Sequence, residues 1–76
     1  MPKLPVISGK DLVRALQKSG FGFISQRGDH VKLRHADSRT AIVPLHNHIK
    51  KGTLKKGILN PLHITVEELI NLIKSK

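Results

Sequence analysis

The chain contains no cysteine and only two aromatic residues, Phe21 and Phe23, among its 76 positions. Without cysteine there is neither a disulfide framework nor a thiolate metal site. A domain of this size must then be stabilised by a core of leucine, isoleucine and valine. The absence of cysteine also suits a reducing compartment. The length is sufficient for one domain, to which we assign residues 1–76.

Long apolar runs are also missing. No segment approaches the roughly 18 apolar residues that a membrane-spanning helix requires, and the first residues, MPKLPVISG, lack the apolar centre of a signal peptide. The basic residues are dispersed and not gathered on one amphipathic helix, which argues against a membrane surface as partner. We therefore expect a cytoplasmic protein.

Acidic residues are scarce: five Asp and Glu stand against fourteen Lys and Arg, which gives a net charge of +9. Such an excess on a small surface favours a polyanionic partner, either a nucleic acid or an acidic protein. Solubility through charge alone is the simpler alternative.

Helical signals lie at both ends of the chain. Ser8 with Asp11 is typical of a capped N-terminus, and the apolar spacing that follows predicts a first helix over about residues 9–19, stopped by Gly20. Thr53 is a plausible cap for a second helix that Pro61 prevents from continuing.

A third helix is predicted after the capping box Thr65-Val66-Glu67-Glu68 and continues to about Ile73. The two C-terminal helices are expected to bury Leu54, Ile58 and Leu59 in the second, and Leu69, Ile70, Leu72 and Ile73 in the third.

Three β-prone segments, 21–26, 30–35 and 40–45, lie between these helices and are separated by the turns Gly28-Asp29 and Asp37-Ser38. The second segment alternates, so that one face holds Val31 and Leu33 and the other holds His30, Lys32 and Arg34. The order α-β-β-β-α-α predicts an α+β fold: a three-stranded antiparallel sheet with helices packed on one face.

His30 lies beside cations on the predicted open face of the sheet, with Arg27 just before the turn. RNA cleavage needs a base, an acid and positive charge for the phosphate, and histidine can transfer protons near neutral pH. A surface histidine on an ordinary basic strand is the alternative that the pattern leaves open.

Four lysines, Lys50, Lys51, Lys55 and Lys56, cluster where the second helix begins. The N-terminus of a helix also attracts anions, so this cluster is expected to bind phosphate, although a solvated charged face has the same pattern.

The remaining histidines predict less. His35 faces the buried side and is expected to be partly buried and hydrogen-bonded. His46 and His48 could chelate a metal as H-x-H, but a zinc site requires three or four ligands, so we expect no metal site and no cofactor.

Five segments together resemble the HicA family of toxin–antitoxin mRNA interferases. They are S-G-K-D-L-V-R-A-L, G-x-H-V-x-L-R-H, I-V-P-L-H, K-K-G-T-L-K-x-x-I-L and V-E-E-L, in this order over nearly the whole chain. The resemblance implies a fold like that of a double-stranded-RNA-binding domain. It also implies cleavage of mRNA without a cofactor, and His30 as the catalytic histidine.

The same resemblance implies a HicB-like antitoxin that covers the active site, so the chain would be a monomer when free and part of a hetero-oligomer when inhibited. The family's V-P-x-H element matches Val43, Pro44 and His46, but this match alone gives His46 no catalytic role. A non-catalytic RNA-binding module with the same fold is the alternative function.

Asp29 departs from the family, which usually has a small polar residue, often serine, before the histidine. A carboxylate beside a histidine favours the imidazolium, but it also repels an approaching phosphate. The sequence leaves open which effect is larger.

Overall fold

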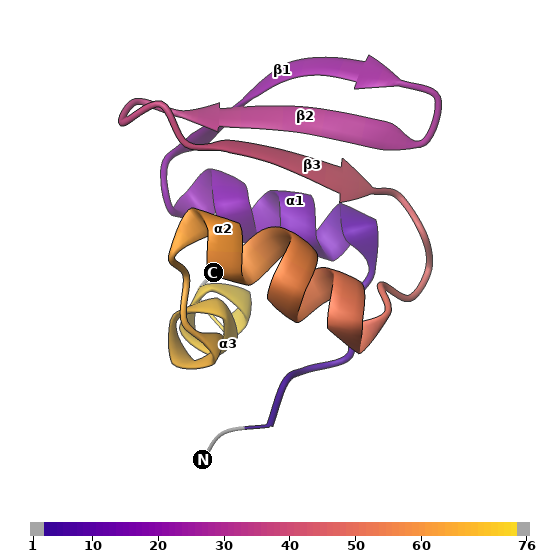
Figure 1. The fold of residues 1–76 in the computed structure, drawn as a ribbon, viewed down its shortest axis with the longest axis vertical. Helices are drawn as coiled ribbons and strands as arrows, with labels where there is room; N and C mark the ends of the chain where they lie inside the picture. Colours follow the sequence, from indigo (N-terminus) through magenta and orange to yellow (C-terminus); the bar gives the residue numbers. More distant parts are fainter. Residues whose placement is uncertain (1–2, 75–76) are drawn as a thin grey trace.

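The computed structural model describes residues 3–74, and in it the helices lie together beneath one face of a three-stranded sheet (Figure 1). The predicted α+β class and the element order are confirmed, with the second helix divided into two parts of different winding. The bounds are α1 Gly9–Lys18, β1 Phe21–Arg27, β2 His30–His35, β3 Thr40–Pro44, η1 Thr53–Leu59, α2 Asn60–Leu62 and α3 Val66–Lys74.

The ends of α1 follow from local chemistry. The Ser8 hydroxyl accepts a hydrogen bond from the backbone N–H of Asp11 at 3.1 Å, which confirms the predicted cap. At the other end, Gly20 has a φ of 104°, and a Cβ there would lie 2.8 Å from Nε2 of His35. Glycine is suited to this position because it has no Cβ: it adopts a positive φ without strain and leaves room for the His35 ring.

The sheet is antiparallel with strand order β1-β2-β3. The predicted alternation of β2 is confirmed, since Val31 and Leu33 are buried while His30, Lys32 and Arg34 are exposed. Across the sheet, Val31 pairs with Val43 and Leu33 with Ala41, which extends the buried face onto β3.

A single cluster of buried side chains joins the sheet to the helices. Burial of each leucine contributes about 1.5–3 kcal/mol. No polar or charged side chain is buried within residues 3–74, so every group that could perform chemistry lies at or near the surface. The largest fully buried side chains are Leu12, Leu16, Leu33, Leu54, Leu59, Leu62, Leu69 and Val43.

The second helix differs from the prediction at both ends. Residues 51 and 52 are already helical, so Thr53 is not its cap. Pro61 lies inside α2 and does not end the helix. The preceding segment η1 is a π-helix, in which hydrogen bonds extend over five residues, as from the N–H of Asn60 to the carbonyl of Lys55. This wider winding accommodates a proline that a regular turn would exclude.

The capping box of α3 is confirmed, because the hydroxyl of Thr65 accepts from the N–H of Glu68 at 3.1 Å while the Glu68 carboxylate accepts from Thr65. Ile73 was predicted to be buried, which is wrong: it is 41% exposed. α3 packs mainly against α1 at the edge of the molecule, so its apolar stripe is covered only in part. None of the helices between residues 3 and 74 is long and apolar enough to cross a membrane.

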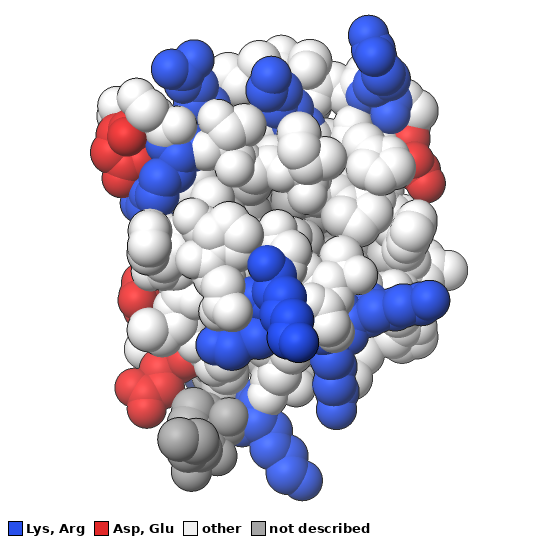
Figure 2. Space-filling model, in the orientation of Figure 1, with Lys and Arg blue, Asp and Glu red and all other residues white. Residues whose placement is uncertain are grey.

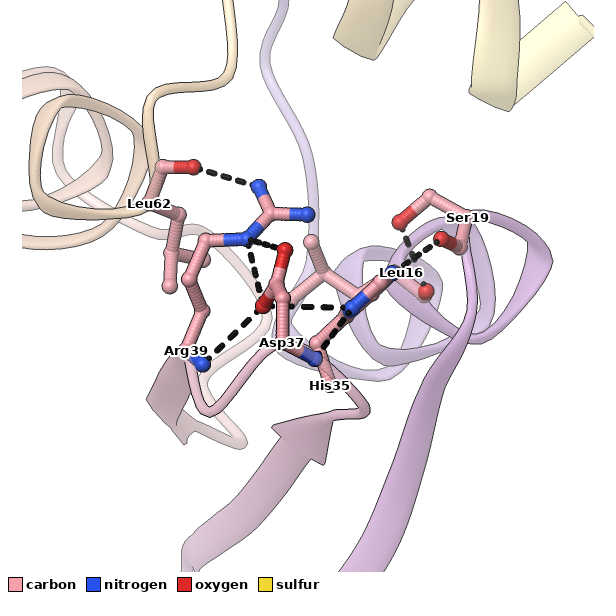
Figure 3. A network of polar contacts seen from close by, with 6 residues as sticks. All are labelled: Leu16, Ser19, His35, Asp37, Arg39 and Leu62. Carbon is pink, nitrogen blue, oxygen red and sulfur yellow. Dashed lines mark hydrogen bonds and ion pairs between the residues drawn. The ribbon is translucent and has the colours of Figure 1, made fainter.

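A polar network ties the turn between β2 and β3 to the helices (Figure 3). The guanidinium of Arg39 donates to the Leu62 carbonyl at 2.6 Å and to the Asp37 carboxylate at 2.8 and 3.0 Å. His35 joins the same network, with Nε2 3.2 Å from the Ser19 carbonyl and Nδ1 accepting from the N–H of Asp37. The expectation of a partly buried, hydrogen-bonded His35 is confirmed.

Candidate active site

His30 is the first residue of β2, immediately after the turn from β1. Its backbone pairs with Arg27 on one side and Pro44 on the other, which places it in the central strand with a neighbour on each flank. Because Val31 faces the helices, the His30 side chain projects from the opposite, open face of the sheet, where it is 56% exposed.

A β-bulge in β1 brings Arg27 to the same face. The pairing shifts between Phe23 and Ser25, so that Ile24 has no partner in β2. Without the extra residue, the alternation would turn Arg27 toward the helices; with it, Arg27 lies opposite His30. The sequence did not predict this bulge.

The open face is hollowed around these side chains. The hollow has a volume of about 420 Å³ and is lined by Ser25, Arg27, His30, Lys32 and Ile42. Arg34 lies on the same face further along β2, opposite Gly22 and Thr40, and does not line it. The structure therefore brings three of the four predicted residues of this strand pair into one cavity.

The carboxylate of Asp29 connects two histidines. Its Oδ1 lies 2.8 Å from Nδ1 of His30, and its Oδ2 lies 3.3 Å from Nε2 of His46. His46 follows the end of β3, so the contact joins one end of the β1–β2 turn to the segment that leaves the sheet. Asp29, His30 and His46 will be called the Asp29 bridge.

Asp29 is ionised within this bridge. Partial desolvation acts to raise its pKa, but the charge of His30, a backbone N–H and the ring of His46 together act more strongly in the other direction. The pKa of the Asp29 carboxyl is therefore lowered below its ordinary value.

An ionised carboxylate can only accept hydrogen bonds. The two ring nitrogens that face Asp29, Nδ1 of His30 and Nε2 of His46, can therefore contact it only as donors. The other nitrogens, Nε2 of His30 and Nδ1 of His46, are directed away from the carboxylate. Each histidine thus keeps one nitrogen for a proton transfer.

Backbone hydrogen bonds hold the bridge in position. The carbonyl of Asp29 accepts from the N–H of Leu45 at 2.6 Å, and the carbonyl of His46 accepts from the N–H of Gly9 at 2.9 Å. The first fixes the turn against the end of β3, and the second fixes His46 against the start of α1. Both histidines are therefore attached to regular secondary structure.

On the face that Figure 2 shows, most of the basic residues form two groups. Figure 2 shows one along the sheet, at the top, and the other over the helix that is orange in Figure 1, with a largely uncharged band between them. We call the second the lysine group; it consists of Lys50, Lys51, Lys55 and Lys56, all exposed as predicted. Lys50 lines a hollow of about 250 Å³ together with His46 and His48, whereas Lys55 lines another on the far side of η1.

His46 contacts the carboxylate of Asp29, but within residues 3–74 no group of three or more histidine, aspartate or glutamate side chains is arranged to hold a metal ion.

Sequence reasoning identified His30 but missed its connection to His46. Asp29 was treated only as the neighbour of His30, and His46 received no role. The signal that links them is the pairing of His30 with Pro44, which brings the residues after Pro44 to the β1–β2 turn. That register depends on the whole sheet and is not visible in any one motif.

Comparison with known proteins provides an independent finding. A family model described as the HicA toxin of bacterial toxin–antitoxin systems matches residues 9–59, more than half of the chain. The matched stretch begins with α1, ends with η1 and contains the whole Asp29 bridge. A search of the curated proteins finds no match.

Proposed function

The chain belongs to the HicA family of toxins from bacterial toxin–antitoxin systems, and from this premise we propose that it is an endoribonuclease that cleaves mRNA. His30 is its general acid/base, and the cations of the sheet face and of the lysine group bind the RNA backbone. The reaction uses no metal ion or other cofactor.

The observation that carries this proposal is the setting of His30. Its Nε2 is directed away from Asp29, and the ring lies in a hollow that also contains Arg27 and Lys32. Proton transfer by a positioned imidazole typically accelerates a reaction about 10²–10⁴-fold. The two cations would stabilise the negative charge that develops on the phosphate.

The position of Asp29 supports an active enzyme. The carboxylate does not line the hollow, and both of its oxygens contact imidazole rings, which lie between it and a phosphate bound there and so weaken its repulsion. Although Asp29 departs from the family pattern, we expect it to orient His30 rather than to exclude the substrate.

The lysine group extends the RNA-binding surface beyond the sheet. His46 and Lys50 line one hollow, and the Asp29 bridge connects His46 to the hollow around His30. A single RNA strand placed across His30 can therefore continue toward the lysine group. Phosphate contacts of this kind act on any sequence and weaken with salt.

We assign a HicB-like antitoxin as the protein partner, with which the toxin forms a hetero-oligomer. The sheet face combines cations with the exposed apolar side chain of Ile42, which lies opposite Lys32, a combination suited to a protein interface. An interface of about 800 Å² on this side would occupy a substantial part of the 5172 Å² surface. Acidic residues of the antitoxin would complement the cations and block access to His30.

The test is the cleavage of a labelled RNA by purified protein in the presence of EDTA, with His30→Ala and His30→Gln as variants. We expect the parent to cleave, and both variants to lose activity by about 10²–10⁴-fold while keeping RNA affinity and melting temperature. His48→Ala, at an exposed histidine outside the Asp29 bridge, is the matched control.

Two outcomes would contradict the proposal. RNA binding by the parent without cleavage under any condition would identify a non-catalytic RNA-binding module. Cleavage that His30→Ala leaves unchanged would remove His30 from the reaction, and cleavage that EDTA abolishes would show a metal requirement.

A further inference from the structure

The Asp29 bridge contains a second histidine that the proposed role of His30 does not use. We propose that His46 supplies the second proton transfer of RNA cleavage, so that His30 and His46 act as an acid–base pair oriented by Asp29. This inference rests on the proposed nuclease function.

Cleavage of RNA by its own 2′-hydroxyl requires two proton transfers. One imidazole removes the 2′-hydroxyl proton as the 2′-oxygen forms a bond to phosphorus. The bond between phosphorus and the 5′-oxygen breaks, its electron pair stays on the oxygen, and an imidazolium protonates it. The products are a 2′,3′-cyclic phosphate and a 5′-hydroxyl, and the two histidines have exchanged protonation states. One histidine performs only one of these transfers at a time.

The geometry of the bridge fits this division. Both rings contact the same carboxylate, at 2.8 and 3.3 Å, and each directs its second nitrogen away from it. Cations flank both rings, with Arg27 and Lys32 around His30 and Lys50 beside His46.

A purely structural role explains the bridge less well. Asp29, His30 and His46 are each more than half exposed, and ion pairs at exposed positions contribute little to stability. The nearby backbone hydrogen bonds from Leu45 and Gly9 already hold the two segments together. The contacts of the rings with Asp29 therefore have orientation as their main effect.

The first test compares His46→Ala with His48→Ala, a control in the same hollow and only two residues away. We expect His46→Ala to lower the rate of RNA cleavage about 10²–10⁴-fold, with RNA affinity and melting temperature close to those of the parent. His48→Ala removes an imidazole from the same hollow without touching Asp29, so it should lose far less of the cleavage rate than His46→Ala. Full activity in His46→Ala, beside an inactive His30→Ala, would overturn the inference and leave the nuclease function intact.

The second test assigns the two transfers. In an RNA whose scissile 5′-oxygen is replaced by sulfur, the leaving thiolate needs no proton, so the general acid is dispensable. We expect this substrate to restore most of the lost rate to one of His30→Ala and His46→Ala, and not to the other. Recovery by both variants, or by neither, would contradict an acid–base pair.

The third test addresses Asp29 as the positioning residue. Asp29→Asn keeps the size of the side chain, removes its charge and replaces one of its two acceptor oxygens by an NH₂ group, so the carboxylate no longer accepts from both rings. We expect His46→Ala to cost a smaller factor in the Asp29→Asn background than in the parent, because the three residues act as a unit. If the double variant loses a factor in cleavage rate equal to the product of the two single losses, Asp29 does not couple the histidines.

Failure of this inference differs from failure of the proposed function. A parent protein that does not cleave RNA refutes the nuclease itself. A parent that cleaves with His30 alone refutes only the pair.

Discussion

Replacement of Gly9 by alanine should damage both the fold and the candidate site. Gly9 is the first residue of α1, and a Cβ there would overlap the carbonyl oxygen of Pro44 and lie 2.7 Å from Cα of Leu45. These are backbone atoms, which cannot rotate away as a side chain can. The helix must therefore move away from the segment that follows β3, which carries His46.

The size of the effect follows from the contacts at risk. Overpacking against a fixed neighbour costs about 1–3 kcal/mol, and the hydrogen bonds from Gly9 to His46 and from Leu45 to Asp29 contribute about 1 kcal/mol each if lost. Alanine recovers about 0.5–1 kcal/mol through its smaller backbone entropy loss. The expected net loss, with both hydrogen bonds broken, is about 2–4.5 kcal/mol, against a total of about 4–11 kcal/mol for 76 residues.

Urea unfolding followed by far-UV circular dichroism measures this loss, because the chain has no tryptophan or tyrosine to serve as a fluorescent probe. Gly57→Ala is the control: a Cβ there meets only a methyl group of Thr53 at 3.8 Å, so alanine should stabilise the helix by about 0.5–1 kcal/mol. RNA cleavage by Gly9→Ala should also fall under conditions where the variant is folded. A Gly9→Ala protein as stable as the parent would refute the packing argument.

Two further predictions concern charge. Replacement of Lys55 and Lys56 by glutamine should weaken binding of unrelated RNAs about equally, flatten its salt dependence and weaken co-purification with a HicB-like antitoxin. An unchanged salt slope would remove these two lysines from the RNA-binding surface, and unchanged co-purification would remove them from the antitoxin interface. The hydrogen bond from Arg39 lowers the pKa of Asp37 below its ordinary value of 3.8, so the stabilisation is present above that value and is lost as the pH falls through the lowered pKa. In Asp37→Asn the free energy of unfolding should therefore fall less between neutral and acidic pH than in the parent, as measured by urea unfolding at each pH. The same decrease in both proteins would contradict this.

Local patterns were sufficient to predict most of the fold. Alternation identified the buried face of β2, and caps identified the starts of α1 and α3, because both signals depend on residues within a few positions of one another. The second helix was predicted less well, since the π-helical winding of η1 allows Pro61 inside the helix. Propensities assume regular turns, and they fail where the winding changes.

The candidate site could be predicted only in part, for a related reason. The cation pattern and the alternation of β2 were enough to place His30 on the open face. The position of Arg27 depends on the bulge at Ile24, which inverts the alternation in the second half of β1. His46 reaches Asp29 because β3 pairs with β2 in one particular register. Both features are decided by pairing between strands, and neither has a signature in the segment that it affects.

The effect of Asp29, which departs from the family pattern, also depends on how the strands pair. Judged from its neighbour alone, a carboxylate before the proposed catalytic histidine is ambiguous, because it both orients an imidazole and repels a phosphate. The register of β2 and β3 adds a second contact, since it brings the ring of His46 to the other oxygen of the carboxylate. A histidine ring lies close to each oxygen of the carboxylate, and Asp29 itself does not line the hollow where phosphate is proposed to bind. The proposed positioning role of Asp29 therefore depends on His46, and the two residues should be considered together.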